Sequence, residues 1–303
     1  MNTQTIVLNR NNVVLGTNNT KYIYQFPKKI KIDGQEIALA SLNMYYSWPN
    51  IQAMYNNNVF TYVWWDYQGN LTNTQNIIIP DGNYSISVLS SFIQSQMLLR
   101  GHYLKQATSQ NKIYFISFIE NPTYYATEIT INSMFAYGSQ TDYINENIPV
   151  SHTDPITGQT YWTGWKMPST RQYPQVVFTQ SSKMREFLGF NAGTYPIAGT
   201  PVNSMYDILG QIAPMTYPVS AINIQSNFCY SDIAIPNNIL FSFSQGNSTY
   251  GDLIIKDPQN LIWCRIPDGI YNQLELLFID QDFNPLKILD NQLNITILIR
   301  DIN

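Results

Sequence analysis

Short runs in which apolar side chains recur at every second position, separated by strong turn signals, occupy both ends of this chain. Near the end Ile295, Ile297 and Ile299 fall on one side of a predicted strand, and the run Tyr22–Phe26 alternates in the same way near the start. A period of two places one set of side chains on each face of a strand. Turns such as Asp33-Gly34 join such strands into antiparallel hairpins. We therefore expect sheets with one buried face and one face that is at least partly wet.

The middle of the chain follows a different period. Ser85 can cap a helix whose apolar stripe runs from Ile86 to Met97, and Gly101 is a suitable stop for it. A second short helix, at Met184–Leu188, ends before a glycine. The central segment is therefore predicted to contain helices as well as strands.

This change of pattern predicts two domains. Residues 1–70 and 205–303 form a mainly β sandwich of two sheets, and residues 71–204 form an α+β insertion domain. The order of strands along the chain does not by itself separate a jelly roll from another Greek-key sandwich.

Composition favours a chain made for assembly. Charged residues make up 12% of it and aromatic residues 14%, whereas an average soluble domain has about 25% charged residues. Interface cores are depleted of charge and enriched in aromatic side chains. The net charge of −4 argues against contact with nucleic acid, which needs a clustered cationic face.

One local basic stretch stands apart from this balance. It contains Lys21, Lys28, Lys29 and Lys31, with Arg10 nearby. Lysines on an edge strand block unwanted strand pairing, and this is the interpretation that we favour. The alternative is a surface that faces packaged nucleic acid.

Residues for catalysis or metal binding are sparse. The two histidines are His102 and His152, and zinc sites need three or four converging ligands. No Gly-x-Ser-x-Gly nucleophile motif or phosphate-binding glycine loop occurs. Cys229 and Cys264 share no metal-type spacing, and we expect two buried, reduced thiols. The sequence predicts no enzyme, no cofactor and no metal, although a pair of catalytic carboxylates can be judged only in space.

The chain starts with a polar segment and contains no apolar run of about 18 residues. We therefore expect no signal peptide and no membrane span, and synthesis in a cytosol-like compartment.

Tryptophans are the candidate recognition residues. Trp64 and Trp65 are predicted to point to opposite sides of one strand, one into the core and one beneath the insertion or a neighbour. Trp162 and Trp165 lie in a segment that offers no strand to pack them, so a surface site for a sugar or receptor is as well supported as burial.

Several of these motifs, taken in order, resemble the penton, or minor capsid, proteins of virophages and the related Maverick/Polinton elements. The segments that carry the resemblance are Ile79–Ser85 with the helix after it, Phe187–Phe190, Leu276–Asp280, Asn284–Leu286 and Ile295–Arg300.

This resemblance implies a single jelly roll in an icosahedral virion, with the insertion on the outer side. It implies a homopentamer at each capsid vertex, with double-jelly-roll major capsid protein trimers as neighbours and assembly in the host cytoplasm. The alternative function is a jelly-roll carbohydrate-binding or host-attachment module.

Overall fold

The computed structural model describes residues 3–203 and 205–302. Position 204, where the predicted insertion ends, and positions 1, 2 and 303 lie outside the described residues. The chain divides into two compact units, one built from residues 1–49 and 217–303 and the other from residues 50–216. We call the first the sandwich unit and the second the inserted unit.

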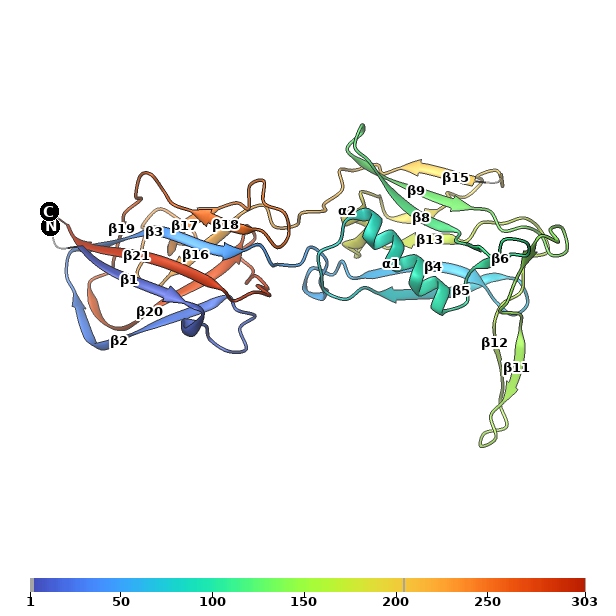
Figure 1. The fold of residues 1–303 in the computed structure, drawn as a ribbon, viewed down its shortest axis with the longest axis horizontal. Helices are drawn as coiled ribbons and strands as arrows, with labels where there is room; N and C mark the ends of the chain where they lie inside the picture. Colours follow the sequence, from blue (N-terminus) through green and yellow to red (C-terminus); the bar gives the residue numbers. More distant parts are fainter. Residues whose placement is uncertain (1–2, 204, 303) are drawn as a thin grey trace. The chain divides into compact units, whose positions relative to one another are not determined.

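Two antiparallel sheets make up the sandwich unit (Figure 1). The first sheet has the order β1 (Thr3–Asn9), β21 (Leu293–Asp301), β3 (Gln35–Tyr45) and β18 (Leu253–Lys256), and the short β19 (Cys264–Arg265) also pairs with β3. The second sheet has the order β17 (Ile239–Phe243), β16 (Ile222–Ser226), β20 (Gly269–Asp280) and β2 (Lys21–Ile32). A single 3-10 turn, η1 (Arg10–Asn12), follows β1.

The pairing of these strands follows a simple rule. Apart from β19, the first strand of the unit pairs with the last, the second with the seventh, the third with the sixth and the fourth with the fifth. A long antiparallel hairpin rolled into two sheets has this order, and it is the order of a jelly roll. The structure is mainly β, as predicted, and its topology distinguishes between the sandwiches that the sequence left open.

The predicted alternation of the last strand is confirmed. Ile295, Ile297 and Ile299 of β21 are buried, and Asn294 beside them is exposed. Because β21 lies between β1 and β3, its apolar side chains line the middle of the first sheet's inner face. From the second sheet Tyr22 contributes a ring 5.8 Å from that of Phe278.

The inserted unit has its own sheets and its own core. Its largest sheet has the order β14 (Gly193–Tyr195), β13 (Gln175–Phe178), β4 (Val59–Trp65) and β5 (Leu71–Ile78). A second has the order β15 (Met205–Leu209), β9 (Ala126–Asn132) and β8 (Ile116–Asn121). A small three-stranded sheet has the order β10 (Tyr143–Ile144), β6 (Leu104–Gln106) and β7 (Lys112–Ile113), and a two-stranded sheet is the hairpin of β11 (Val150–Thr153) and β12 (Thr160–Thr163). A single 3-10 turn, η2 (Ala53–Tyr55), precedes β4.

Both predicted helices form in this unit. The backbone N–H of Val88 donates to the Ser85 hydroxyl, which caps α1 (Ile86–Leu99). Gly101 follows α1 with φ +74°, a left-handed conformation that favours glycine. The helix packs on β8, where the N–H of Phe118 donates to the Ser90 hydroxyl at 3.0 Å. The second helix, α2 (Met184–Leu188), also ends at a left-handed glycine.

The unit boundary lies earlier than residue 71, where we had placed it. The strand β4 pairs with β5 and β13, both in the inserted unit, so residues 50–70 belong with the inserted unit. The second boundary falls after residue 216 and not at 204/205. At the two ends of this unit the side-chain amide of Asn50 donates to the carbonyl of Thr216 at 3.0 Å. The inserted unit therefore starts and ends at neighbouring points.

Candidate assembly surfaces

The hairpin of β11 and β12 forms a ribbon on the inserted unit. All residues of both strands are exposed, and the register pairs Ser151 with Trp162 and His152 with Tyr161. Figure 1 shows the two strands projecting from the other sheets of this unit. We call residues 150–163 the arm.

The turn of the arm is built by one carboxylate. The N–H groups of Ile156 and Thr157 donate to Oδ1 of Asp154 at 2.8 and 2.9 Å, and these bonds lower the pKa of Asp154. This local bonding is typical of aspartate at a turn. It leaves the apolar side chain of Ile156 at the tip, 93% exposed.

The root of the arm is anchored in the core of the inserted unit. Trp165 is only 1% exposed, and its indole N–H donates to the carbonyl of Gly101 at 2.7 Å. Next to it, Gly164 has φ +78°, and a Cβ there would lie 2.4 Å from the carbonyl oxygen of Ile148. On the arm itself, Trp162 stacks on Tyr67 with the ring centroids 5.0 Å apart and the planes 3° from parallel.

The sequence left burial and a surface site equally supported for Trp162 and Trp165, and the structure separates these two residues. Trp165 is a core residue, and only Trp162, at 45% exposure, can meet a partner. Sequence reasoning did not pair Tyr67 with Trp162, because the two residues lie far apart along the chain. The signal for the arm itself was present in the composition of Thr160–Thr163, because threonine and aromatic residues favour strands.

The prediction that Trp64 and Trp65 point in opposite directions was wrong. Both are fully buried in the core of the inserted unit, and their rings meet edge to face at 4.8 Å. The register between β4 and β5 shifts between these two residues. Such a bulge re-aims a side chain relative to the regular pleat, which lets successive tryptophans share one core.

A buried histidine lies beside these tryptophans. His102 stacks on Trp64 with ring centroids 4.9 Å apart, and its Nδ1 lies 2.7 Å from the hydroxyl oxygen of Tyr62. Burial, with a smaller effect from the charge of Arg100, lowers the pKa of His102 to about 3. Burial also raises the pKa of Tyr62. This histidine is a neutral core residue.

In the sandwich unit, the outer face of the first sheet is uncharged over two rows of paired residues. One row joins Asn9, Asn294, Asn43 and Ile255 across β1, β21, β3 and β18, and the next joins Val7, Thr296 and Ser41. Val7 and Ile255 are exposed, as is Leu253, two residues from Ile255 on the same side of β18. A groove of about 430 Å³ opens here between Asn9, Tyr45 and Leu253.

The basic stretch lies on β2, at the edge of the second sheet. Lys21 is paired with Glu275 at 2.6 Å and Lys31 with Asp33 at 3.0 Å. Lys28 and Lys29 are exposed where the register with β20 is interrupted. Charge and a bulge on an edge strand both oppose further strand pairing, which agrees with the interpretation that we favoured.

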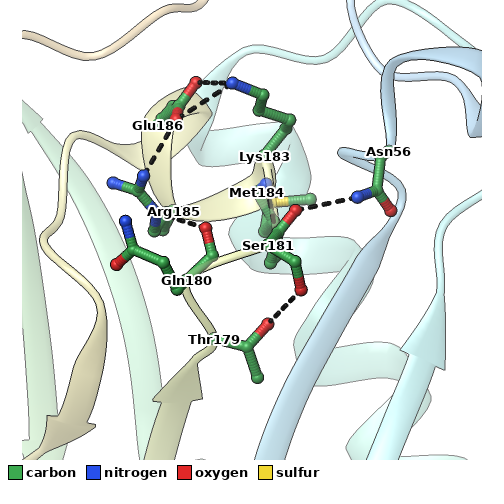
Figure 2. A network of polar contacts seen from close by, with 9 residues as sticks. Asn56, Thr179, Gln180, Ser181, Lys183, Met184, Arg185 and Glu186 are labelled. Carbon is green, nitrogen blue, oxygen red and sulfur yellow. Dashed lines mark hydrogen bonds and ion pairs between the residues drawn. The ribbon is translucent and has the colours of Figure 1, made fainter.

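Figure 2 shows a network of polar contacts around α2. Glu186 accepts from Lys183 at 2.9 Å and from Arg185 at 3.0 Å, and the Asn56 amide donates to the Ser181 carbonyl at 2.8 Å. These bonds tie the short helix to the turn at Asn56. The network therefore positions α2.

No group of three or more potential metal ligands occurs among residues 3–203 and 205–302. Over the same residues, none of the helices is long and apolar enough to cross a bilayer. Neither cysteine is in a disulfide, as expected, but only Cys229 is buried and Cys264 is half-buried. Their thiols hydrogen-bond to each other, which raises the pKa of Cys229 and lowers that of Cys264 to about 7.

Fold and surface together define an antiparallel β protein of two units, with a jelly-roll strand order and exposed apolar side chains on both units. Comparison with solved structures finds similarity over 99% of this chain to the mavirus penton protein, with 13% identity, a TM-score of 0.43 and all of that chain covered. The Sputnik virophage structure is similar over 99% of this chain and 97% of the other, with 10% identity and a TM-score of 0.35. No family model and no curated protein matches.

Proposed function

We propose that this chain is a structural capsid protein that forms the pentameric vertex of an icosahedral, virophage-type shell. The carrying observation is the pair of uncharged rows on the outer face of the first sheet, where the apolar side chains of Val7 and Ile255 remain exposed on a rigid jelly roll. An exposed apolar surface with little charge is suited to burial against another protein. A rigid wedge with one such face can close a ring by repeating a single heterologous contact.

The proposed partners are further copies of this chain and the major capsid protein. Each copy contacts further copies in a homopentamer, and the pentamer is surrounded by major capsid protein trimers in the virion after assembly in the host cytoplasm. The work of such a protein is geometric, and the proposal assigns it no catalytic residue, cofactor or metal. The low overall charge supports protein contacts in preference to nucleic acid.

Mass photometry and cryo-electron microscopy of the purified chain, alone and co-expressed with the major capsid protein, test this proposal. We expect particles of five times the monomer mass, and five-fold density for this chain in shells. Val7→Lys with Ile255→Lys should abolish the rings by placing like charges on the contact face. Ile270→Lys, at an exposed apolar position on the second sheet, is the matched control. Density for this chain only away from the five-fold positions would refute the vertex assignment.

Attachment to a host glycan is the alternative. Trp162 and Tyr161 are exposed on the arm and could stack on a sugar. The burial of Trp165 weakens this reading, because it removes half of the predicted aromatic pair. If Trp162→Ala abolishes binding on a glycan array but leaves assembly unchanged, the attachment function is favoured.

A further inference from the structure

The arm has two open edges. Among residues 3–203 and 205–302 its sheet contains only β11 and β12, so no third strand of this part of the chain covers the backbone N–H and C=O groups on the outer side of each strand. Natural proteins protect such edges with lysines, inward-pointing charges or prolines within the strand. From Asn147 to Trp165 the only charged residue is Asp154, and its carboxylate is occupied in the turn. The edges of the arm lack the usual charge protection.

The arm is also preorganised by contacts at its root. Trp165 is fixed in the core, Gly164 lets the chain turn closely past the carbonyl of Ile148, and Trp162 lies flat on Tyr67. A two-stranded ribbon on its own is only marginally stable in water. These anchors reduce the freedom that the ribbon would lose on binding, and preorganisation of this kind strengthens association.

The side chains of the arm indicate which class of partner it can bind. A membrane surface or a nucleic acid would require cationic side chains, and the arm carries no lysine or arginine. A sugar stacks on an open aromatic face, but Tyr67 covers one face of Trp162. An uncharged edge with the exposed apolar residues Val150, Ile156 and Tyr161 matches a protein surface that is itself poor in charge.

This chain supplies such a surface, because charged residues make up only 12% of it. We propose that the arm binds a second copy of this chain, by strand pairing along a free edge and burial of Ile156 and Tyr161. The inference rests on the proposed function, because it names one contact through which the copies assemble. Neutral surfaces on both sides allow identical copies to meet without like-charge repulsion, and backbone pairing supplies the affinity.

The first experiment adds like charge to the arm. Ile156→Glu with Tyr161→Glu should raise the apparent dissociation constant for self-association by about tenfold or more in mass photometry. Ile233→Glu is the matched control, because Ile233 is an isoleucine of the sandwich unit that is 98% exposed, and it should change this constant by less than about twofold. Every substituted side chain is exposed, so the melting temperatures should stay close to that of the parent.

The second experiment maps the contact directly. A benzoylphenylalanine photo-crosslinker at position 156 is placed in a mixture of ¹⁴N- and ¹⁵N-labelled copies of the full chain. We expect crosslinked peptides that join a light segment to a heavy one. Crosslinks confined to peptides of one label would overturn the proposal.

The outcomes separate the two proposals. A parent chain that stays monomeric alone and with the major capsid protein refutes the proposed function and this inference together. A parent that assembles, with an arm variant that assembles equally well, refutes the inference alone. The inference is also overturned if the arm variant loses glycan binding but assembles like the parent.

Discussion

Acid should destabilise the inserted unit through His102. In the folded chain burial lowers its pKa to about 3, against 6.5 for an ordinary histidine. Between these values the unfolded chain binds a proton that the folded chain does not, so stability is fully present above pH 6.5 and is lost as the pH falls. Each pH unit below 6.5 removes about 1.4 kcal/mol, so the free energy of unfolding should fall by about 2 kcal/mol between pH 7 and pH 5.

Urea unfolding at both pH values, followed by tryptophan fluorescence, measures this loss, because Trp64 stacks directly on the His102 ring. The variant His102→Gln removes the titrating group and keeps an oxygen that can accept from Tyr62. We expect its free energy of unfolding to fall by about 2 kcal/mol less than that of the parent over the same interval. His152→Gln, on the exposed arm, is the control and should behave as the parent does. Equal pH dependence in the parent and His102→Gln would refute the argument that His102 is buried in its neutral form.

Further predictions follow from the unit boundary, the arm and the thiols. Replacing residues 50–216 with a short Gly/Ser linker should leave a folded sandwich unit, because the two ends of the inserted unit are neighbours. We expect a cooperative thermal transition and a β-sheet circular dichroism spectrum. Aggregation without a β-sheet spectrum would contradict this prediction. Gly164→Ala should lower the melting temperature more than Gly158→Ala, because both have positive φ but only the first would bring a Cβ against backbone. Iodoacetamide should label Cys264 before Cys229, because the pKa of Cys264 is lowered and that of Cys229 is raised. The rate of labelling at Cys264, measured by peptide mass spectrometry, should increase as the pH rises through about 7.

Local features of this fold were readable from the sequence. The cap at Ser85, the left-handed glycine at Gly101 and the buried face of Ile295–Ile299 all form as predicted. Each depends on side chains within one or two turns of helix or along one strand, and the chemistry of those few residues decides the backbone conformation.

The wrong prediction for Trp64 and Trp65 and the open one for Trp165 have a different origin. Trp64 and Trp65 were placed on opposite sides because a regular strand alternates, but a bulge against β5 puts both into one core. Trp165 was left open as a surface residue because nothing near it in sequence could pack it. In the structure it meets Trp64 and donates to Gly101, a residue from the end of α1.

The sequence by itself determined the class of protein: antiparallel β with an α+β insertion and low charge. These properties follow from composition and short-range periodicity, which each segment carries wherever it lies. Only the tertiary structure decided the rolled strand order, the unit boundary at residue 50 and the split between buried Trp165 and exposed Trp162. The physical reason is that strand pairing and burial depend on contacts between distant segments, and an alternating strand fits many partners equally well until one arrangement buries the whole apolar set at once.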